Sequence, residues 1–301
     1  MLSILIPVFN EDIRPLADDL KLLSKEYQNI EVIFADDASD NEVHQNVNIS
    51  HIKGIANFKY IVRKVNLKYC ANRNMLAQEA KYENLLFLDA DVRINNDNFL
   101  EEWLKFIDKE AVYCGGNNYQ EDRPLDKKLV LKWYHGKMRE ETSLTYRKAH
   151  PYLRFSSSNF LISKQLFLKH SFDEKSKSYG YNDTVYAYSL KQNNIQVIHI
   201  VNPVLNTGLM TDNVFLHKTK EAVENLVFFE NRPYVKEDFR DYIKVLKTFY
   251  RIKGLGLSVV FRIFLKAMED SLIKGLFKEY PPNLRNLDLL KLYYLLEAKR
   301  S

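Results

Sequence analysis

The 301-residue sequence is poor in cysteine and in long apolar runs, and each shortage argues against a class of protein. Its two cysteines, Cys70 and Cys114, belong to no Cys-x-x-Cys or Cys/His cluster, which argues against a disulfide framework and a structural zinc site and favours a reducing cytosol. The apolar N-terminus is short and lacks the basic start of a signal peptide, so it is interpreted as a strand. No uncharged apolar run reaches about 18 residues, and we expect no transmembrane helix.

A strong excess of one charge is also missing. The chain has 44 Lys and Arg against 39 Asp and Glu, a formal net charge of +5. A dedicated nucleic-acid binder would show a clustered basic surface, so we expect no nucleic-acid partner. The mild positive balance suits an anionic small molecule or a loose association with an anionic membrane surface.

Short apolar runs alternate with segments of helical spacing. The predicted strands cover residues 3–8, 30–35, 58–62, 85–88, 160–162 and 195–201. The predicted helices cover residues 13–27, 69–82, 99–107, 164–170 and 184–192. This alternation predicts an α/β fold in which helices flank a mixed, mainly parallel sheet.

Two other regions lack this regular alternation. Residues 120–151 are highly charged, and we expect a long excursion with helical pieces there. After about residue 229 the sequence becomes helical, notably over residues 255–277. We therefore predict a main α/β domain over residues 1–230 and a helical C-terminal extension over residues 231–301.

Polar residues follow the ends of three predicted strands. They are Asn10 with Glu11, Asp36 with Asp37, and Asp89 with Asp91. Ligands bind beyond the carboxyl ends of the strands in such sheets, so we expect these side chains to meet at one edge. A single carboxylate at a strand end is common, whereas three such strand ends in one sheet indicate a site.

Asp89 and Asp91 flank Ala90 and can reach the same ion from one turn of the backbone. Hard carboxylate oxygens suit Mg²⁺ or Mn²⁺, which also take phosphate oxygens and water. The alternative is an ordinary Asp-rich turn. The apolar strand before the triplet and the two other polar strand ends favour the metal site.

The second strand end has two interpretations. A carboxylate at Asp36 or Asp37 can accept a hydrogen bond from the imide N–H of uracil. Alternatively, Asp37, Ser39 or Asp40 caps the helix that follows, and we expect one of them to do so. We assign Asp36 or Asp37 to the nucleotide, and Ser39 and Asp40 to local structure.

Asp183 is the best candidate general base. It follows an aromatic-rich loop that contains Gly180 and begins a predicted helix. A carboxylate at the open face of the site can take the proton of an acceptor hydroxyl. The alternative is an Asp that the helix dipole favours at an N-terminus.

Other polar residues give weaker signals. Arg73 can face phosphate or uracil, or form a surface salt bridge, and His199 follows strand periodicity and is interpreted as structural. His217 and Lys218 are weak phosphate or metal candidates. The segment 156–159, Ser-Ser-Ser-Asn, can bind sugar or form a loop.

Seven short motifs follow one another along roughly the first three quarters of the chain. They are Ser-Ile-Leu-Ile-Pro-Val-Phe-Asn-Glu (3–11), Asp-Asp-Ala-Ser-Asp (36–40), Ala-Asn-Arg-Asn (71–74), Leu-Phe-Leu-Asp-Ala-Asp (86–91), Ser-Asn-Phe-Leu-Ile (158–162), Gly-Tyr-Asn-Asp (180–183) and Asn-Pro-Val (202–204). Each motif alone is weak, but the ordered set resembles the family 2 inverting glycosyltransferases of GT-A fold. The resemblance implies hexosyl transfer from a nucleotide-sugar donor, usually a UDP-sugar, to a saccharide or lipid-linked acceptor in polysaccharide or glycolipid assembly. It also implies Mn²⁺ or Mg²⁺ as the cofactor.

The resemblance also implies roles for individual residues. Pro7, Phe9 and Glu11 would line the nucleotide pocket, and Asp36 or Asp37 would contact the uracil region together with Arg73. Asp89 and Asp91 would engage ribose and metal, and Asp183 would be the catalytic base.

The chain departs from the family pattern at two positions. The family often has an acidic pair where this chain has Asn182-Asp183, so only Asp183 can be the base. Similar members often carry His after Asn-Pro-Val-x, where this chain has Asn206. A third metal ligand there is therefore in doubt, and His217 is a poor substitute.

The helical tail has two interpretations. With Lys266, Lys274 and Lys278, the segment 255–277 can lie on a membrane as an amphipathic helix at the inner face. Alternatively it packs on the main domain or forms a homodimer contact. Apolar stripes at helical spacing more often belong to a core, which favours packing and leaves peripheral membrane contact as the second interpretation.

Two other functions compete with glycosyl transfer. A sugar-nucleotide nucleotidyltransferase would show a Gly-rich, basic loop after the first strand, but residues 7–11 contain no glycine and no Lys or Arg. A non-catalytic sugar-nucleotide-binding module would not need Asp89, Asp91 and Asp183 together.

Overall fold

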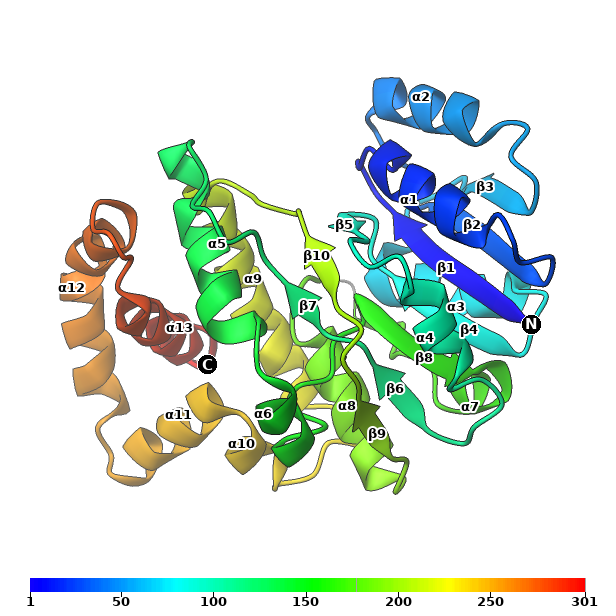
Figure 1. The fold of residues 1–301 in the computed structure, drawn as a ribbon. Helices are drawn as coiled ribbons and strands as arrows, with labels where there is room; N and C mark the ends of the chain where they lie inside the picture. Colours follow the sequence, from blue (N-terminus) through cyan, green and yellow to red (C-terminus); the bar gives the residue numbers. More distant parts are fainter. Residues whose placement is uncertain (177, 301) are drawn as a thin grey trace. The chain divides into compact units, whose positions relative to one another are not determined.

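The computed structural model describes residues 1–176 and 178–300, which form two compact units (Figure 1). The first unit consists of residues 1–120, 140–176 and 182–208, and the second of residues 121–139, 178–181 and 209–300. The sequence predicts a catalytic domain that ends at residue 230. The two compact units do not define which residues take part in catalysis, so this boundary stays a prediction.

A seven-stranded sheet forms the centre of the first unit. Its strands are β1 (Leu2–Val8), β2 (Ile30–Asp36), β3 (Phe58–Val62), β4 (Asn84–Leu88), β6 (Val112–Cys114), β8 (Asn159–Ser163) and β9 (Val197–His199). Their order is β3-β2-β1-β4-β8-β6-β9. The first four strands are parallel, whereas β8 runs antiparallel to both β4 and β6. The predicted α/β fold with a mixed, mainly parallel sheet is confirmed.

Helices cover both faces of this sheet. They are α1 (Arg14–Ser24), α2 (Glu42–Ile52), α3 (Lys68–Glu79), α4 (Phe99–Leu104), α6 (Leu144–Ala149), α7 (Lys164–Lys169) and α8 (Asn182–Gln192). On one face, Leu20 of α1 and Trp103 of α4 belong to the same core cluster as Ile4 of β1. On the other face, residues of α3, α7 and α8 pack in a second cluster with Leu5. Since successive side chains of a strand point to opposite faces, β1 needs its continuous apolar run.

A second, three-stranded sheet in the same unit consists of β5 (Val92–Arg93), β10 (Val204–Asn206) and β7 (Asn117–Asn118), in that order. The central strand β10 runs antiparallel to β5 and parallel to β7. Strands of two or three residues are too short for a periodic pattern, and the sequence did not predict them. This sheet ties the chain after Asp91 to residues 204–206.

The predicted elements agree with the observed ones to within a few residues, but the predicted helix cap is wrong. The side chain of Asn41 caps α2 by accepting a hydrogen bond of 3.1 Å from the backbone N–H of His44. The cap position falls at Asn41, one residue after Asp40, the last of the three candidates Asp37, Ser39 and Asp40.

The second unit is helical. It contains α5 (Val130–His135), α9 (Asp212–Glu230), α10 (Phe239–Tyr242), α11 (Lys244–Gly254), α12 (Ser258–Phe277) and α13 (Leu284–Ala298). The last helix packs against α9, α11 and α12 and buries one side almost completely. The predicted helical tail is therefore confirmed, as are helical pieces within residues 120–151. Among residues 1–176 and 178–300, no helix combines the length and hydropathy needed to span a bilayer.

Candidate active site

A cleft of about 320 Å³ lies at the carboxyl ends of β1, β2 and β4, where the parallel strands were predicted to bring polar groups together. The residues that line it are Pro7, Val8, Phe9, Glu11, Asp37, Asn66, Lys68, Tyr69, Asn72, Arg73, Asp89, Ala90 and Asp91. Seven of the nine predicted site residues are in this wall, and Asp36 and Asp183 lie outside it.

The turn after β1 places Phe9 and Glu11 in the wall of the cleft. Asn10 adopts a left-handed conformation with a φ of 57°, which Asn tolerates better than most residues. Its side-chain oxygen accepts hydrogen bonds of 3.1 Å from the backbone N–H groups of Asp40 and Asn41. The turn is therefore fixed against the loop after β2. Phe9, beside Asn10 in this turn, is 47% exposed.

Asp37 anchors the start of α3. Its two carboxylate oxygens accept hydrogen bonds from the backbone N–H groups of Leu67 (2.7 Å) and Lys68 (2.8 Å). Lys68 has a φ of 74°, a conformation that costs free energy in a non-glycine residue, and these contacts hold it there. Burial raises the pKa of Asp37, and the two N–H donors oppose that shift.

Asp36 is fully buried and turns away from the cleft. Its carboxylate accepts hydrogen bonds from the backbone N–H of Ser39 (2.7 Å) and from the hydroxyl of Tyr60 (2.8 Å). It therefore holds the loop after β2 to β3. Of the two carboxylates that the sequence left open for the nucleotide, Asp37 is the one in the cleft wall.

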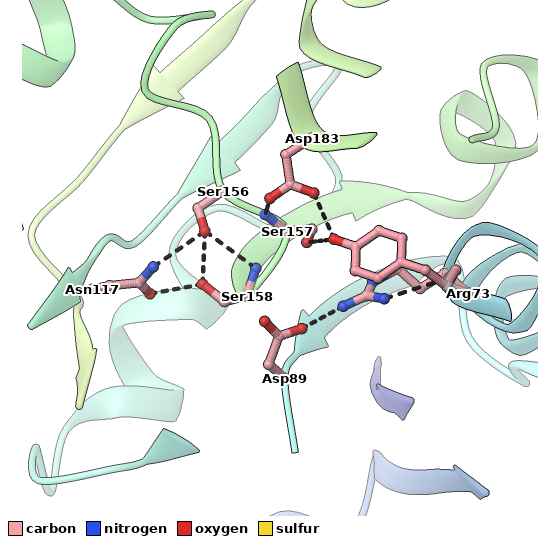
Figure 2. Close-up of polar contacts among 8 residues, drawn as sticks. Arg73, Asp89, Asn117, Ser156, Ser157, Ser158 and Asp183 are labelled. Atoms are coloured by element: carbon pink, nitrogen blue, oxygen red, sulfur yellow. Dashed lines mark hydrogen bonds and ion pairs between the residues drawn. The ribbon is translucent and has the colours of Figure 1, made fainter. Parts of the chain in front are cut away.

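A buried arginine links α3 to the end of β4. The guanidinium of Arg73, whose side chain is only 3% exposed, donates a charge-assisted hydrogen bond to Asp89 (Figure 2). The same guanidinium lies 3.8 Å from the ring centroid of Tyr69. A buried cation needs a charged partner, and Asp89 supplies it. Tyr69 and Arg73 are one helical turn apart, so α3 itself sets this stacking.

Negative charge gathers in front of Asp89. Burial raises the pKa of Asp89 to about 7, the Arg73 cation opposes that shift, and the carboxylates of Asp91 and Asp183 reinforce it. The carboxylates of Asp91 and Asp183 thus oppose the negative charge of Asp89, and the Arg73 cation, which is paired with Asp89, favours it.

Asp91 is held by the segment that follows β10. Its backbone carbonyl accepts hydrogen bonds from the N–H (2.9 Å) and the hydroxyl (2.8 Å) of Thr207. A Cβ atom at Gly208 would lie 1.7 Å from Oδ2 of Asp91. Only glycine at position 208 therefore leaves the Asp91 carboxylate in its place.

Asp183, at the start of α8, is held by two other segments of the first unit. Its oxygens accept hydrogen bonds from the hydroxyl of Tyr69 (2.5 Å) and from the backbone N–H of Ser157 (3.0 Å). The Tyr69 hydroxyl is also hydrogen-bonded to the Ser157 side chain. Because burial raises the pKa of Tyr69 well above 10, this phenol keeps its proton. Both oxygens of Asp183 thus have partners outside its own helix.

A cluster of hydroxyl and amide groups lies near Asp89 and Asp183 (Figure 2). Ser158 Oγ donates to Oδ1 of Asn117 (2.8 Å), the Asn117 amide donates to Ser156 Oγ (3.1 Å), and the two serine hydroxyls are 2.7 Å apart. The backbone N–H of Asp89 donates to the Ser158 carbonyl (3.2 Å). Since β8 runs antiparallel to β4, its first residues lie beside the last residues of β4.

The model of the glycosyl transferase family 2 matches residues 3–171, more than half of the chain. The chain belongs to this family. Asp183 lies beyond the matched residues, so its assignment depends on the geometry around it.

Two curated relatives resemble parts of this chain. An uncharacterized glycosyltransferase of Haemophilus influenzae is 31% identical over 119 residues, which cover 40% of this chain and 47% of that protein. Chondroitin synthase of Escherichia coli is 27% identical over 223 residues, covering 63% and 32% respectively. The chain thus spans less than half the length of each.

Solved structures share its GT-A fold. A mannosyltransferase of Pyrobaculum calidifontis, PcManGT, has a TM-score of 0.60 and 11% identity, with 98% of this chain and 85% of that chain covered. TarS of S. aureus has a TM-score of 0.53 and 17% identity, with 98% and 54% covered. At such identities the likeness shows the fold alone.

The predicted cation site is incomplete as a purely protein site. Among the residues that the structure describes, no group of three or more His, Cys, Asp or Glu side chains is placed to hold a metal ion. The mutual repulsion of Asp89 and Asp91 nevertheless fits a cation that takes its other ligands from phosphate and water.

The remaining sequence candidates lie in different parts of the molecule. Asn206 belongs to β10 opposite Val92, and its side chain accepts a hydrogen bond of 3.1 Å from the N–H of Gly208. His217 lies on α9 of the second unit, 3.5 Å from Glu221. His199 is buried and bonded to the Pro151 carbonyl (2.9 Å), in agreement with its structural interpretation.

Tyr69, Ser157 and Gly208 were missed as site residues by the sequence reasoning. Tyr69 had a usable signal, its spacing of four from Arg73 on one helix. Ser157 lies within the segment 156–159, whose sequence does not distinguish one serine from the others. Gly208 had none, because its importance comes from a close approach to Asp91 across the chain.

Proposed function

We propose that this chain is an inverting glycosyltransferase that moves a hexosyl group from a UDP-sugar to a hydroxyl of a saccharide or lipid-linked acceptor. One observation carries the proposal: Tyr69 contacts both Asp183 and Arg73, and Arg73 is paired with Asp89 in the cleft. A candidate base thus stands beside a candidate donor site. We also propose that residues 1–230 perform the catalysis and that residues 231–301 form an extension.

The relatives support a role in polysaccharide or glycolipid assembly. One curated relative is a chondroitin synthase. A TarS structure with a TM-score of 0.53 is a complex with UDP-GlcNAc, and the PcManGT structure is a complex with GDP-Man and Mn²⁺. A nucleotide-sugar donor is therefore the substrate that we propose for the cleft of this chain.

The donor nucleotide would lie along the ends of β1 and β2. The exposed ring of Phe9 offers a stacking surface for a base, and Asp37 can accept a hydrogen bond from the uracil imide. Glu11, which follows β1, and the backbone at Pro7 would also border the nucleotide. Asp89, fixed by Arg73, would accept hydrogen bonds from the ribose.

Asp91, with Asp89, would hold a divalent cation together with the donor diphosphate. Such an ion neutralises the charge of the departing diphosphate. Gly208 keeps the Asp91 carboxylate available at this position, because any side chain there would displace it. Asn206, two residues away, would support this segment through its bond to the Gly208 N–H.

Asp183 would take the proton of the acceptor hydroxyl. As the acceptor oxygen forms its bond to the anomeric carbon, the bond from that carbon to the diphosphate oxygen breaks, and the configuration inverts. The Tyr69 hydroxyl and the Ser157 N–H would hold the carboxylate in the orientation for attack. No enzyme nucleophile takes part.

Calorimetric titration with UDP and with GDP, each with and without Mn²⁺, tests the donor site. We expect UDP to bind more tightly than GDP, Mn²⁺ to strengthen the binding, and Asp91→Ala to remove the effect of Mn²⁺. Asp97→Asn, a change at an exposed carboxylate outside the cleft, serves as the control. Absence of nucleotide binding, or binding indifferent to both metal and Asp91→Ala, would contradict the donor-site assignment.

Turnover of a panel of sugar nucleotides tests the base. We expect Asp183→Asn to keep donor affinity and to lose at least about a hundredfold in kcat, the usual contribution of general-base catalysis. Unchanged turnover in Asp183→Asn, with the same donor affinity, would remove Asp183 as the base.

A further inference from the structure

Six large apolar side chains are exposed within ten residues at the start of α12. These residues, the 255–264 surface, are Leu255, Leu257, Val259, Val260, Ile263 and Phe264. Ile263 is 62% and Phe264 57% exposed. Single exposed apolar residues are ordinary on a protein, but a contiguous group of this size indicates a surface that binds something.

The first half of α12 is apolar on both sides. Its inward side buries Leu265, and further along Leu272 and Leu276. The outward side carries Val259 and Ile263 at helical spacing, where a surface helix normally has polar residues. After Lys266 the outward side returns to exposed polar residues such as Asp270 and Lys274. The apolar exposure is therefore confined to one end of the helix.

The charged residues within the segment that carries this surface have one sign. Residues 244–268, which comprise α11 and the first half of α12, contain six Lys and Arg and no Asp or Glu. Lys247 and Arg262 face acidic residues elsewhere in the second unit, at 3.2 and 3.7 Å. Arg251, Lys253 and Lys266 are exposed beside the apolar residues.

We propose that the 255–264 surface docks onto an anionic lipid bilayer. Apolar side chains would enter the boundary between headgroups and acyl chains, and the surrounding Lys and Arg would lie at the level of the anionic headgroups. The helix would lie in the plane of the interface, because none of the described helices can span a bilayer. This docking is independent of the transfer chemistry assigned to the first unit.

Two other occupants fit the same surface less well. In a symmetric dimer the 255–264 surface would face the same surface of a second copy. Residues 244–268 carry six positive and no negative charges, so the two copies would repel each other there. A protein partner would need a groove that accepts a helix end with the short Gly254–Leu257 turn before it. A bilayer accepts a convex apolar end without any matching shape.

Co-sedimentation of the full chain with vesicles, without substrates, tests the proposal. The vesicles contain either phosphatidylcholine alone or phosphatidylcholine with phosphatidylglycerol. We expect binding to the anionic vesicles that weakens as salt is raised. Ile263→Ser with Phe264→Ser should lower the partition coefficient by at least about tenfold, given the apolar area withdrawn from the membrane. Lys253→Glu with Lys266→Glu should also lower it by at least about tenfold.

Leu22→Ser with Val43→Ser is the matched control, because these exposed apolar residues lie on α1 and α2, far from the patch in the sequence. It should bind vesicles like the unchanged chain. The thermal unfolding midpoint of each variant shows whether the fold is retained. Three results would overturn the proposal: no binding to anionic vesicles, equal loss of binding in the control, or a dimer in solution that the Ile263/Phe264 change dissociates. Nucleotide titration of the same samples reports separately on the donor site.

Discussion

Two substitutions at Tyr69 separate its two contacts. Tyr69→Phe removes the hydroxyl that donates to Asp183 and keeps the ring under the Arg73 guanidinium. Tyr69→Ala removes both. The first change should therefore act on catalysis alone, and the second on catalysis and on donor binding.

The expected magnitudes follow from the two contacts. A hydrogen bond to a charged acceptor contributes about 1.5–3 kcal/mol. If this energy holds Asp183 in its working orientation, kcat in Tyr69→Phe falls by about 10- to 150-fold, while KM for the donor stays within about twofold. A buried cation–π contact contributes about 2 kcal/mol, so Tyr69→Ala should in addition raise the donor KM by about 30-fold.

Steady-state kinetics with the sugar nucleotide that the panel identifies, and calorimetry for donor affinity, measure both quantities. Tyr69→Phe in an Asp183→Asn background should cause no further loss of kcat, because the two groups act as one unit. Wild-type kcat in Tyr69→Phe would refute the positioning role. An equal rise of donor KM in the Phe and Ala variants would refute the division between ring and hydroxyl.

Three further predictions concern the cleft. Gly208→Ala should abolish the effect of Mn²⁺ on UDP affinity in calorimetry, since its Cβ displaces Asp91, whereas Gly254→Ala, which has open space around its Cβ, should leave it unchanged. Arg73→Lys should weaken UDP binding by about tenfold, because an ammonium group keeps the charge near Asp89 but loses the planar stacking on Tyr69, and full affinity in this variant would contradict that role. Since burial raises the pKa of Asp89 to about 7, lowering the pH through 7 should protonate it and weaken Mn²⁺-dependent UDP binding, and Asp89→Asn should show no such pH dependence.

Much of the first unit could be predicted from the sequence because its signals are local. The apolar run of β1, the spacing of Leu16 and Leu20 in α1, and the carboxylates after β2 and β4 are each visible within a few residues. Parallel topology then places those strand ends at one edge. The cleft wall at this edge follows from these two facts.

What the sequence could not give depends on pairing between distant segments. The strands β5, β7 and β10 have two or three residues each and form only because they pair with one another. The sequence could not tell which of Asp36 and Asp37 lines the cleft, because the hydrogen bond from the Tyr60 hydroxyl to the buried Asp36 carboxylate joins distant parts of the chain. The predicted cap of α2 is wrong because several neighbouring residues have side chains suited to capping. The backbone conformation places the cap at Asn41.

The antiparallel strand β8 has a consequence for the order in which the site forms. The strands β1 to β4, which carry most residues of the proposed donor side, are joined by successive local crossovers. The side with Asp183 and Ser157 requires β8 to return across a long excursion and pair with β4. Closing a long loop costs more entropy than closing a short one, so we expect the donor side to form earlier during folding. The strand ends that carry Asp37 and Asp89 would then be in place before Asp183 and Ser157 come together.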